Sequence, residues 1–261
     1  MRAALICCVA IALTSCTEDL PKPELIADLR ILSVRAEPPE GTAGTTVALD
    51  ALIATPDPGA SVARAWLACI AVGGSQIGPE ACALAALPTV ACADAPEATA
   101  CLLGSGETAS YRLPSAALAG RAAGESGQVF ILLVAADGTA DCAGALLAAT
   151  VPAGCRVAAK RVAVTAAASA TPNTNPTVSD LTIAGSAVSV VVPASAADAT
   201  ADGPEALFLS WFITAGAIDS FRTDATGAGL MNAWTPADAA GRIYVVVRDG
   251  RGGEAWVTGS R

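Results

Sequence analysis

The chain has 261 residues and is acidic, with 15 Lys and Arg against 24 Asp and Glu and a net charge of −9. This balance argues against nucleic-acid binding and against docking on anionic lipid head groups, since both need clustered cations. Histidine is absent, which removes Ser-His-Asp and Cys-His nucleophiles, the common zinc sites and the commonest general base. We therefore expect a protein that is not an enzyme and has no cofactor or metal.

Residues 1–15 have the pattern of a bacterial secretory signal. Arg2 is followed by an apolar run from Ala3 to Leu13, which is shorter than the about 20 residues of a membrane-spanning helix. The run ends in Leu13-Thr14-Ser15-Cys16, which resembles the lipobox of bacterial lipoproteins. The alternative interpretation is an ordinary cleaved signal with an incidental cysteine.

The lipobox resemblance implies that Cys16 becomes the lipidated first residue of the mature chain. Acyl chains such as palmitate bind membranes because each buried methylene contributes roughly 0.8 kcal/mol. In such lipoproteins an aspartate directly after the cysteine retains the protein at the inner membrane. Thr17 occupies that position here, so the resemblance implies the outer membrane, with a periplasmic or surface-exposed protein. Residues 16–28 would then form a lipidated tether.

Strand patterns recur in the same order in the two halves of the chain. In the first half, alternating apolar residues cover 47–53, a tryptophan (Trp66) lies in 65–69, and a β-rich run over 127–134 leads to Asp137-Gly138. In the second half, alternating residues cover 181–192, Trp211 lies in 210–214, and a run over 241–248 leads to Asp249-Gly250. Each run closed by Asp-Gly is typical of a strand that enters a hairpin.

The spacing from tryptophan to the later run is longer in the first half, and the surplus matches the segment from Gly73 to Ser105. We interpret the halves as two copies of one domain, the first of which carries a cysteine-rich insert at about 73–105. The alternative is a set of unrelated apolar strands. Many short strands with frequent turns favour β-sandwiches, and a buried tryptophan on a middle strand is typical of immunoglobulin-like cores.

The predicted fold class is therefore all-β, with two tandem immunoglobulin-like β-sandwich domains. The first spans residues 29–166 and the second spans residues 177–261. Residues 167–176 contain small polar residues and two prolines, which cannot bury apolar area, and are predicted to form a semi-stiff linker.

Two stretches carry a further resemblance. The segment from Leu29 to Pro39 with Ala43-Gly44-Thr45-Thr46-Val47, and the stretch from Trp211 through Asp249-Gly250-Arg251-Gly252-Gly253 to Trp256, resemble lipoproteins of myxobacteria. The last hairpin is also similar to that of PKD and other immunoglobulin-like bacterial surface domains. The resemblance implies an outer-membrane lipoprotein with such domains, and it carries no catalytic residues.

The cysteines after Cys16 are even in number, which in an exported protein indicates three disulfides. We expect the pairs Cys82–Cys92, Cys69–Cys101 and Cys142–Cys155. The alternative is a metal cluster, but no two of these cysteines have the C-x-x-C spacing of such sites. All six precede residue 156, which agrees with two structural units.

The second half of the sequence contains only weak candidates for a ligand-binding site. Asp249 on its glycine-rich turn could bind Ca²⁺, but its spacing differs from an EF-hand and a plain hairpin turn explains the same residues. Trp234 and Trp256 could stack on a sugar if exposed, although core or domain contacts are the commoner use of tryptophan. Gly227-Ala228-Gly229 lacks the strand-to-helix context of a nucleotide loop.

The functional hypothesis is thus a non-catalytic structural or protein-binding module at the cell envelope. It would be held to the membrane by its lipid anchor, with an envelope or extracellular protein or glycan as partner and no nucleic acid. The alternative is a carbohydrate- or Ca²⁺-binding surface module. A hydrolase that uses two carboxylates is the third hypothesis, and a sequence cannot show the required acidic pair.

Overall fold

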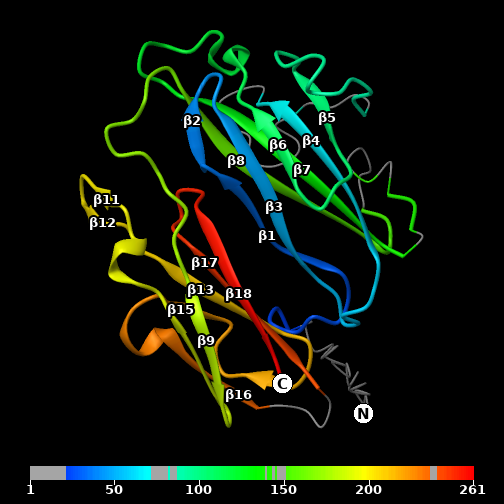
Figure 1. Cartoon of the computed structure of the whole chain (residues 1–261), viewed down its shortest axis with the longest axis vertical. Helices are drawn as coiled ribbons and strands as arrows, with labels where there is room; N and C mark the ends of the chain where they lie inside the picture. Colours follow the sequence, from blue (N-terminus) through cyan, green and yellow to red (C-terminus); the bar gives the residue numbers. More distant parts are fainter. Residues whose placement is uncertain are drawn as a thin grey trace, which may run out of the picture.

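The computed structural model describes residues 22–71, 82, 87–138, 140–142, 145, 151–235 and 240–261. Its described elements are β-strands and short 3₁₀ turns, and the strands form two sandwiches that lie one above the other in Figure 1. The chain is all-β, with two tandem immunoglobulin-like sandwiches. The signal and lipobox expectations for residues 1–16 fall outside the described residues. In the described part of the chain, no helix has the length and apolar character to cross a membrane.

The first sandwich contains two sheets. One has the order β1-β3-β6 and the other has the order β2-β8-β7-β4-β5. All pairs are antiparallel except β2 with β8, which are parallel. The strands are β1 (Arg30–Glu37), β2 (Glu40–Thr42), β3 (Thr46–Ala54), β4 (Val62–Ile70), β5 (Ala100–Gly104), β6 (Ala109–Arg112), β7 (Gly127–Asp137) and β8 (Cys155–Thr165).

The second sandwich repeats this strand order. One sheet has the order β14-β16-β10-β9 and the other β15-β13-β17-β18, and a small hairpin, β11-β12, is added. The strands are β9 (Ser179–Ala184), β10 (Ala187–Val191), β11 (Ala199–Thr200), β12 (Gly203–Pro204), β13 (Phe208–Ile213), β14 (Ala217–Ile218), β15 (Arg222–Asp224), β16 (Met231–Thr235), β17 (Arg242–Arg248) and β18 (Glu254–Ser260). The order β8-β7-β4-β5 therefore matches β18-β17-β13-β15, and the two halves share one topology.

Each sandwich is built around a tryptophan on its central strand. Trp66 on β4 and Trp211 on β13 are fully buried between the two sheets of their own half. Each indole N–H has a partner: Trp66 donates to the carbonyl of Gly106 at 3.0 Å, and Trp211 donates to the Thr223 hydroxyl at 2.9 Å. The hydrogen bonds allow these large rings to be buried without an unpaired polar atom.

The period-two patterns predicted from the sequence form the inner faces of the sheets. Val47 and Leu49 of β3 are buried in the first core, and Val188 and Val190 of β10 are buried in the second. The last part of the predicted insert at about 73–105 belongs to the sandwich itself. Residues 100–104 form β5 and pair with β4. Strand β5 corresponds to β15 of the second half and belongs to the sheet.

Gly127 and Gly241 occupy equivalent places, just before or at the start of β7 and β17, and neither has room for a side chain. A Cβ on Gly127 would lie 2.0 Å from the carbonyl oxygen of Ala117, and one on Gly241 would lie 2.7 Å from the Trp234 ring. The later strand of each sandwich thus enters its sheet through a close approach that only glycine permits.

We predict that Gly127→Ala and Gly241→Ala each lower the free energy of unfolding by about 1–3 kcal/mol, because overpacking displaces the neighbouring atoms. Gly127→Ala should have the larger effect, since its clash is with backbone. Gly59→Ala is the control, because its added Cβ meets only the Asp57 carboxylate at an ordinary 3.4 Å. Urea denaturation measures all three, and equal stability of the three variants would contradict the prediction.

Candidate functional site

The two sandwiches meet through a buried apolar contact. Outward-facing Leu32 of β1 and Leu52 of β3 pack with Phe212 of β13 and with Tyr244 and Val246 of β17. A register shift in β1 between residues 31 and 33 places Leu32 in a bulge next to Ser33. The bulge turns two successive residues of β1 toward the second sandwich, one apolar and one polar.

The centre of this junction is polar, and Glu254 of β18 is its hub. Its carboxylate lies 3.4 Å from Nζ of Lys160 on β8 and 3.7 Å from Nε of Arg248 on β17. The hydroxyl of Ser33 donates to the same carboxylate, and Lys160 also donates to the carbonyl of Gly252. Groups from both sandwiches are thereby joined at one carboxylate.

Lys160 is only 4 % exposed, which is rare for a lysine and requires a partner. Burial lowers the pKa of its ammonium group below the ordinary value, and nearby Arg248 acts in the same direction. The charges of Glu254 and Asp249 and the hydrogen bond to Glu254 oppose this shift, and burial is the largest of these effects. Desolvation of the charged lysine therefore destabilises the folded state by more than its ion pairs and hydrogen bonds stabilise it.

This pKa shift predicts a pH dependence of stability. Below both pKa values Lys160 is charged in the folded and unfolded chains, so the full burial cost is present. As the pH rises through the folded-state pKa toward 10.5, the buried lysine loses its proton and the cost is relieved. Wild type should therefore gain stability relative to Lys160→Met between pH 7 and pH 10.

Urea denaturation of both proteins at the two pH values measures this difference. Lys160→Arg is the control, because arginine keeps its charge throughout the range. A constant difference between wild type and Lys160→Met would contradict the assignment.

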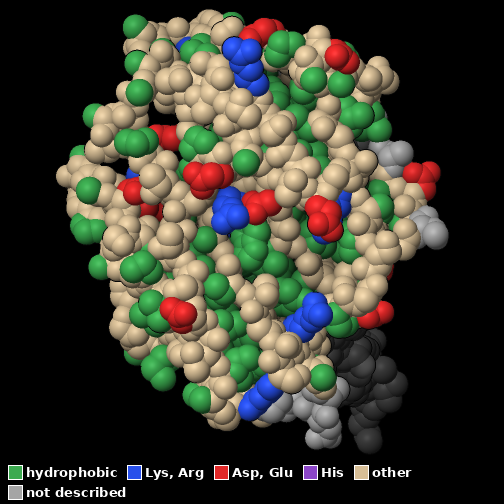
Figure 2. All heavy atoms as spheres, in the orientation of Figure 1, with side chains coloured by type: hydrophobic (Ala, Val, Ile, Leu, Met, Phe, Trp, Pro, Cys, Tyr) green, Lys and Arg blue, Asp and Glu red, His purple; other side chains and the backbone are tan. Residues whose placement is uncertain are grey.

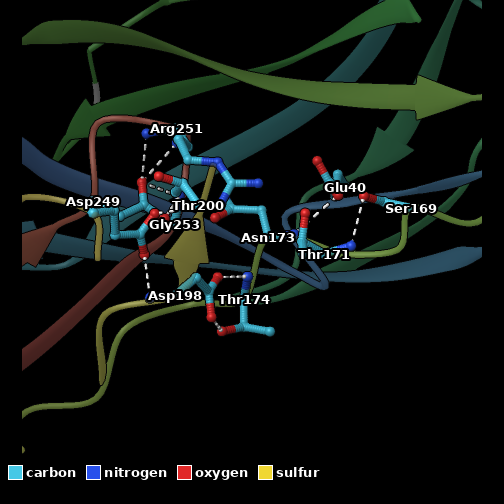
Figure 3. A network of polar contacts seen from close by, with 12 residues as sticks. Glu40, Ser169, Thr171, Asn173, Thr174, Asp198, Thr200, Asp249, Arg251 and Gly253 are labelled. Atoms are coloured by element: carbon cyan, nitrogen blue, oxygen red, sulfur yellow. Dashed lines mark hydrogen bonds and ion pairs between the residues drawn. The ribbon is translucent and has the colours of Figure 1, made fainter. Parts of the chain in front are cut away.

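Residues of the predicted linker bind to both sandwiches. The Asn173 N–H donates to Glu40 at 2.9 Å, and the Asn175 side-chain amide donates to the Ala36 carbonyl at 2.8 Å. The Asn175 side-chain oxygen accepts the N–H of Glu254 at 2.9 Å. Figure 3 shows Asn173 and Thr174 between Glu40 on one side and Asp198 and Asp249 on the other. The segment thus lies against the junction and supports the hub residue directly.

The aspartate of the glycine-rich turn after β17 accepts hydrogen bonds from the backbone of the same turn. One carboxylate oxygen of Asp249 accepts the N–H of Arg251 at 2.7 Å and those of Gly252 and Gly253 at 2.8 Å (Figure 3). These donors occupy the oxygens that a Ca²⁺ ion would need, so the hairpin-turn interpretation explains this residue. Among the residues described, no three Asp, Glu, Cys or His side chains gather as a metal site.

Glu205 lies next to this turn, with one oxygen on the N–H of Asp198 at 3.0 Å and the other 3.5 Å from the Arg251 guanidinium. Burial raises the pKa of its carboxyl, and the charges of Asp249 and Asp198 act in the same direction. Arg251 and the Asp198 N–H oppose the shift. Glu205 thus ties the β11-β12 hairpin to the turn.

The two tryptophans considered for sugar stacking both pack inside the protein. Trp234 is fully buried in the second core, and its indole N–H donates to the Ala215 carbonyl at 2.9 Å. Trp256 packs at the junction, where the Arg35 guanidinium lies 4.7 Å from its ring centroid. They serve as a core residue and a domain contact.

The disulfides are Cys69–Cys82, Cys92–Cys101 and Cys142–Cys155. The predicted pairs Cys82–Cys92 and Cys69–Cys101 are wrong. In the register of β4 and β5, Cys101 is opposite Ala68 and Cys69 is opposite Ala100. Because successive residues of a strand point to opposite faces, Cys69 and Cys101 lie on different faces of the sheet and cannot be joined.

The disulfides Cys69–Cys82 and Cys142–Cys155 cover the outer face of the five-stranded sheet. Their sulfur-bearing side chains belong to a second apolar cluster with Leu67, Phe130 and Leu132. Cys92–Cys101 lies on the inner side, with the sandwich core. The cysteine-rich region is therefore attached to both faces of one sheet.

An uncovered strand edge lies beside this region. Strand β6 pairs only with β3 in the described part of the chain, and a hollow of about 670 Å³ lies between β6 and residues 91–96. Tyr111 of β6 has a buried hydroxyl with no hydrogen-bond partner among the described residues. Burial raises the pKa of this hydroxyl to about 12, with the charge of Glu97 acting in the same direction.

Glu97 fastens the cysteine-rich region to the sandwich near this edge. Its carboxylate accepts the N–H of Ala116 at 2.8 Å and the N–H and hydroxyl of Ser115. The hydrogen bond from Ala116 is the largest effect that lowers the pKa of Glu97. The hollow beside β6 thus has a fixed wall.

Comparison with known proteins gives no close relative. No family model matches the chain, and no curated protein matches it. Among solved structures, the D0-D1 domain of intimin is 12% identical over 87% of this chain and 97% of its own, with a TM-score of 0.22. The Salmonella enterica SafA pilin in complex with the SafB chaperone is 12% identical over 91% and 99%, with a TM-score of 0.28.

The Yersinia pseudotuberculosis adhesin InvE is 11% identical over 87% of this chain and 58% of its own, with a TM-score of 0.22. Such low identities and scores support no particular activity. The class of the protein rests on its own strand order, which is that of two immunoglobulin-like sandwiches.

Proposed function

We propose that this chain is an exported, lipid-anchored and non-catalytic protein-binding module of the bacterial envelope. The pattern of residues 1–16 supports export and lipidation at Cys16, and the resemblance to myxobacterial lipoproteins supports the outer membrane. The three disulfides support an oxidising compartment, because thiols stay reduced in the cytosol.

The uncovered edge of β6 is the observation that carries the binding role. An edge strand presents unpaired backbone N–H and C=O groups, which an extended segment of a partner can pair with. The hollow beside β6 gives such a segment room for side chains, and its wall is held by Cys92–Cys101 and by Glu97. Neither Asp249 nor the two tryptophans favours the alternative of a Ca²⁺- or carbohydrate-binding module.

Export and lipidation predict a defined chemical form of the native protein. Mass spectrometry of protein purified from membranes should find an N-terminal Cys16 that carries acyl chains, and oxidised cysteines elsewhere. Cys16→Ser should move the protein from the membrane to the soluble fraction, because it removes the acylation site. An intact Met1 on the native protein, or wild type and Cys16→Ser in the same fraction, would overturn the proposal.

The binding role predicts that charges on the β6 edge block capture of an envelope protein. Ser110→Glu with Arg112→Glu places two carboxylates on exposed positions of this edge. Pull-down with wild type should retain an envelope protein that the double variant retains at least tenfold less. Thr182→Glu with Ala184→Glu, on exposed positions of β9, is the matched control.

Equal capture by both double variants would remove β6 as the binding edge. Measurable turnover of an envelope polymer by the purified protein would overturn the non-catalytic role.

A further inference from the structure

The second sandwich shows how the edge equivalent to that of β6 is closed. Strand β16 pairs with β10 as β6 pairs with β3, and β14 pairs antiparallel with the other edge of β16. The N–H of Asp219, directly after β14, donates to the Ala233 carbonyl of β16 at 3.0 Å. Ile218 of β14 lies opposite Trp234 and is buried with it in the second core. One apolar side chain from an added strand therefore completes the core at this edge.

The equivalent connection in the first sandwich takes a different course where it is described. Strand β14 lies in the connection from β13 to β15, and the connection from β4 to β5 is its equivalent. Ala71, Cys82 and Leu87 of that connection pack in the outer cluster of the five-stranded sheet, where the disulfide Cys69–Cys82 attaches it. The inward side chains of β6 lie on the opposite side of this sheet, in the core. Among the described residues, none pairs with β6 as β14 pairs with β16.

The backbone of β6 directs hydrogen-bonding groups at this edge. The Leu113 N–H donates to the Thr45 carbonyl, and the Leu113 carbonyl accepts the N–H of Gly44, each at 2.8 Å. Backbone groups of an antiparallel strand alternate between its two neighbours. Those of Ser110 and Arg112 therefore point away from β3, toward the hollow that β6 lines. In the same way, the groups of Ala233 face β14 in the second sandwich.

The side chains beside this edge differ between the core side and the solvent side. Tyr111 and Cys92 line the hollow from the buried core, and Leu103 packs against that core. Arg112 is on the solvent side of β6, where it is exposed and has no ion pair among the described residues. A strand bound at this edge would thus meet apolar groups with its inward side chains and a cation with its outward ones.

Given the binding role proposed for β6, we propose that its partner supplies an extended segment that runs antiparallel to β6 and carries a large apolar residue directly preceded by an acidic one. The apolar side chain enters the hollow opposite Tyr111, as Ile218 enters the second core. In an antiparallel pair the preceding residue is then opposite Arg112. Side chains at directly opposed positions share one face of the sheet, and opposite charges there stabilise the pair.

Fluorescence anisotropy of the purified protein with labelled synthetic peptides tests this chemistry. The probe is Ser-Thr-Thr-Glu-Ile-Thr-Thr-Ser, and the two comparison peptides have Ala in place of Ile or Lys in place of Glu. Wild type should bind the probe at least tenfold more tightly than the Ala peptide, because burial of the larger side chain is lost. It should also bind the probe several-fold more tightly than the Lys peptide, because lysine repels Arg112.

Two variants locate the bound peptide. Ala93→Trp fills the hollow from an exposed position of its wall and should weaken binding of the probe at least tenfold. Ala123→Trp is the matched control, since Ala123 is exposed and lies outside the lining. Arg112→Glu should reverse the charge preference, so that the Lys peptide binds more tightly than the probe.

Undiminished binding by Ala93→Trp, or an unchanged preference in Arg112→Glu, would overturn the proposed segment. Absence of probe binding would overturn it as well. If an envelope protein is still captured through β6 in that case, the binding role of the edge stands and only the chemistry of the segment fails. Loss of both results would remove the binding role and the segment together.

Discussion

The carboxylate of Glu254 joins groups from three other strands inside the junction, and the orientation of the two sandwiches depends on it. Ser33, Lys160 and Arg248 all contact this one side chain. The surrounding apolar contacts favour closure but have no direction, because the hydrophobic effect is proportional to area. Hydrogen bonds and ion pairs require particular angles and distances, so the polar hub selects one arrangement among many that would bury similar area. Figure 2 shows charged residues of both signs side by side across the middle of the molecule.

The duplicated topology explains why two equivalent apolar faces need a cover. In the first sandwich, Leu67, Leu132 and Val134 point out of the sheet that holds Trp66. The equivalent residues of the second sandwich are Phe212, Tyr244 and Val246. The first set packs with described residues beside the disulfides Cys69–Cys82 and Cys142–Cys155, among them Ala145. The second set is covered by the first sandwich, through β1 and β3. The equivalent outer faces of the two sheets are therefore buried in two different ways.

The sequence was sufficient to predict the strands and the repeat, because period-two alternation and the two tryptophans are local signals. It predicted Cys142–Cys155 and was insufficient for the other two disulfides. Their pairing depends on which face of β4 and β5 each cysteine occupies, and this follows from a register that sequence spacing does not reveal. The junction was missed because Ser33, Lys160 and Glu254 are far apart in the chain. One signal was available: residues 129–136 and 243–247 are almost continuously apolar, which is typical of strands buried on both faces.

Burial on both faces also restricts where a ligand can bind. A sandwich with one free apolar face could offer that face to a partner, but here both central sheets are already covered by the chain itself. This burial makes edges, turns and the seam between the halves the more accessible surfaces for recognition. The edge of β6 is a feature of this kind, and the disulfide Cys92–Cys101 and Glu97 hold the wall of the hollow beside it. The disulfides and the Glu254 hub thus determine which surfaces remain for binding as well as how the domains pack.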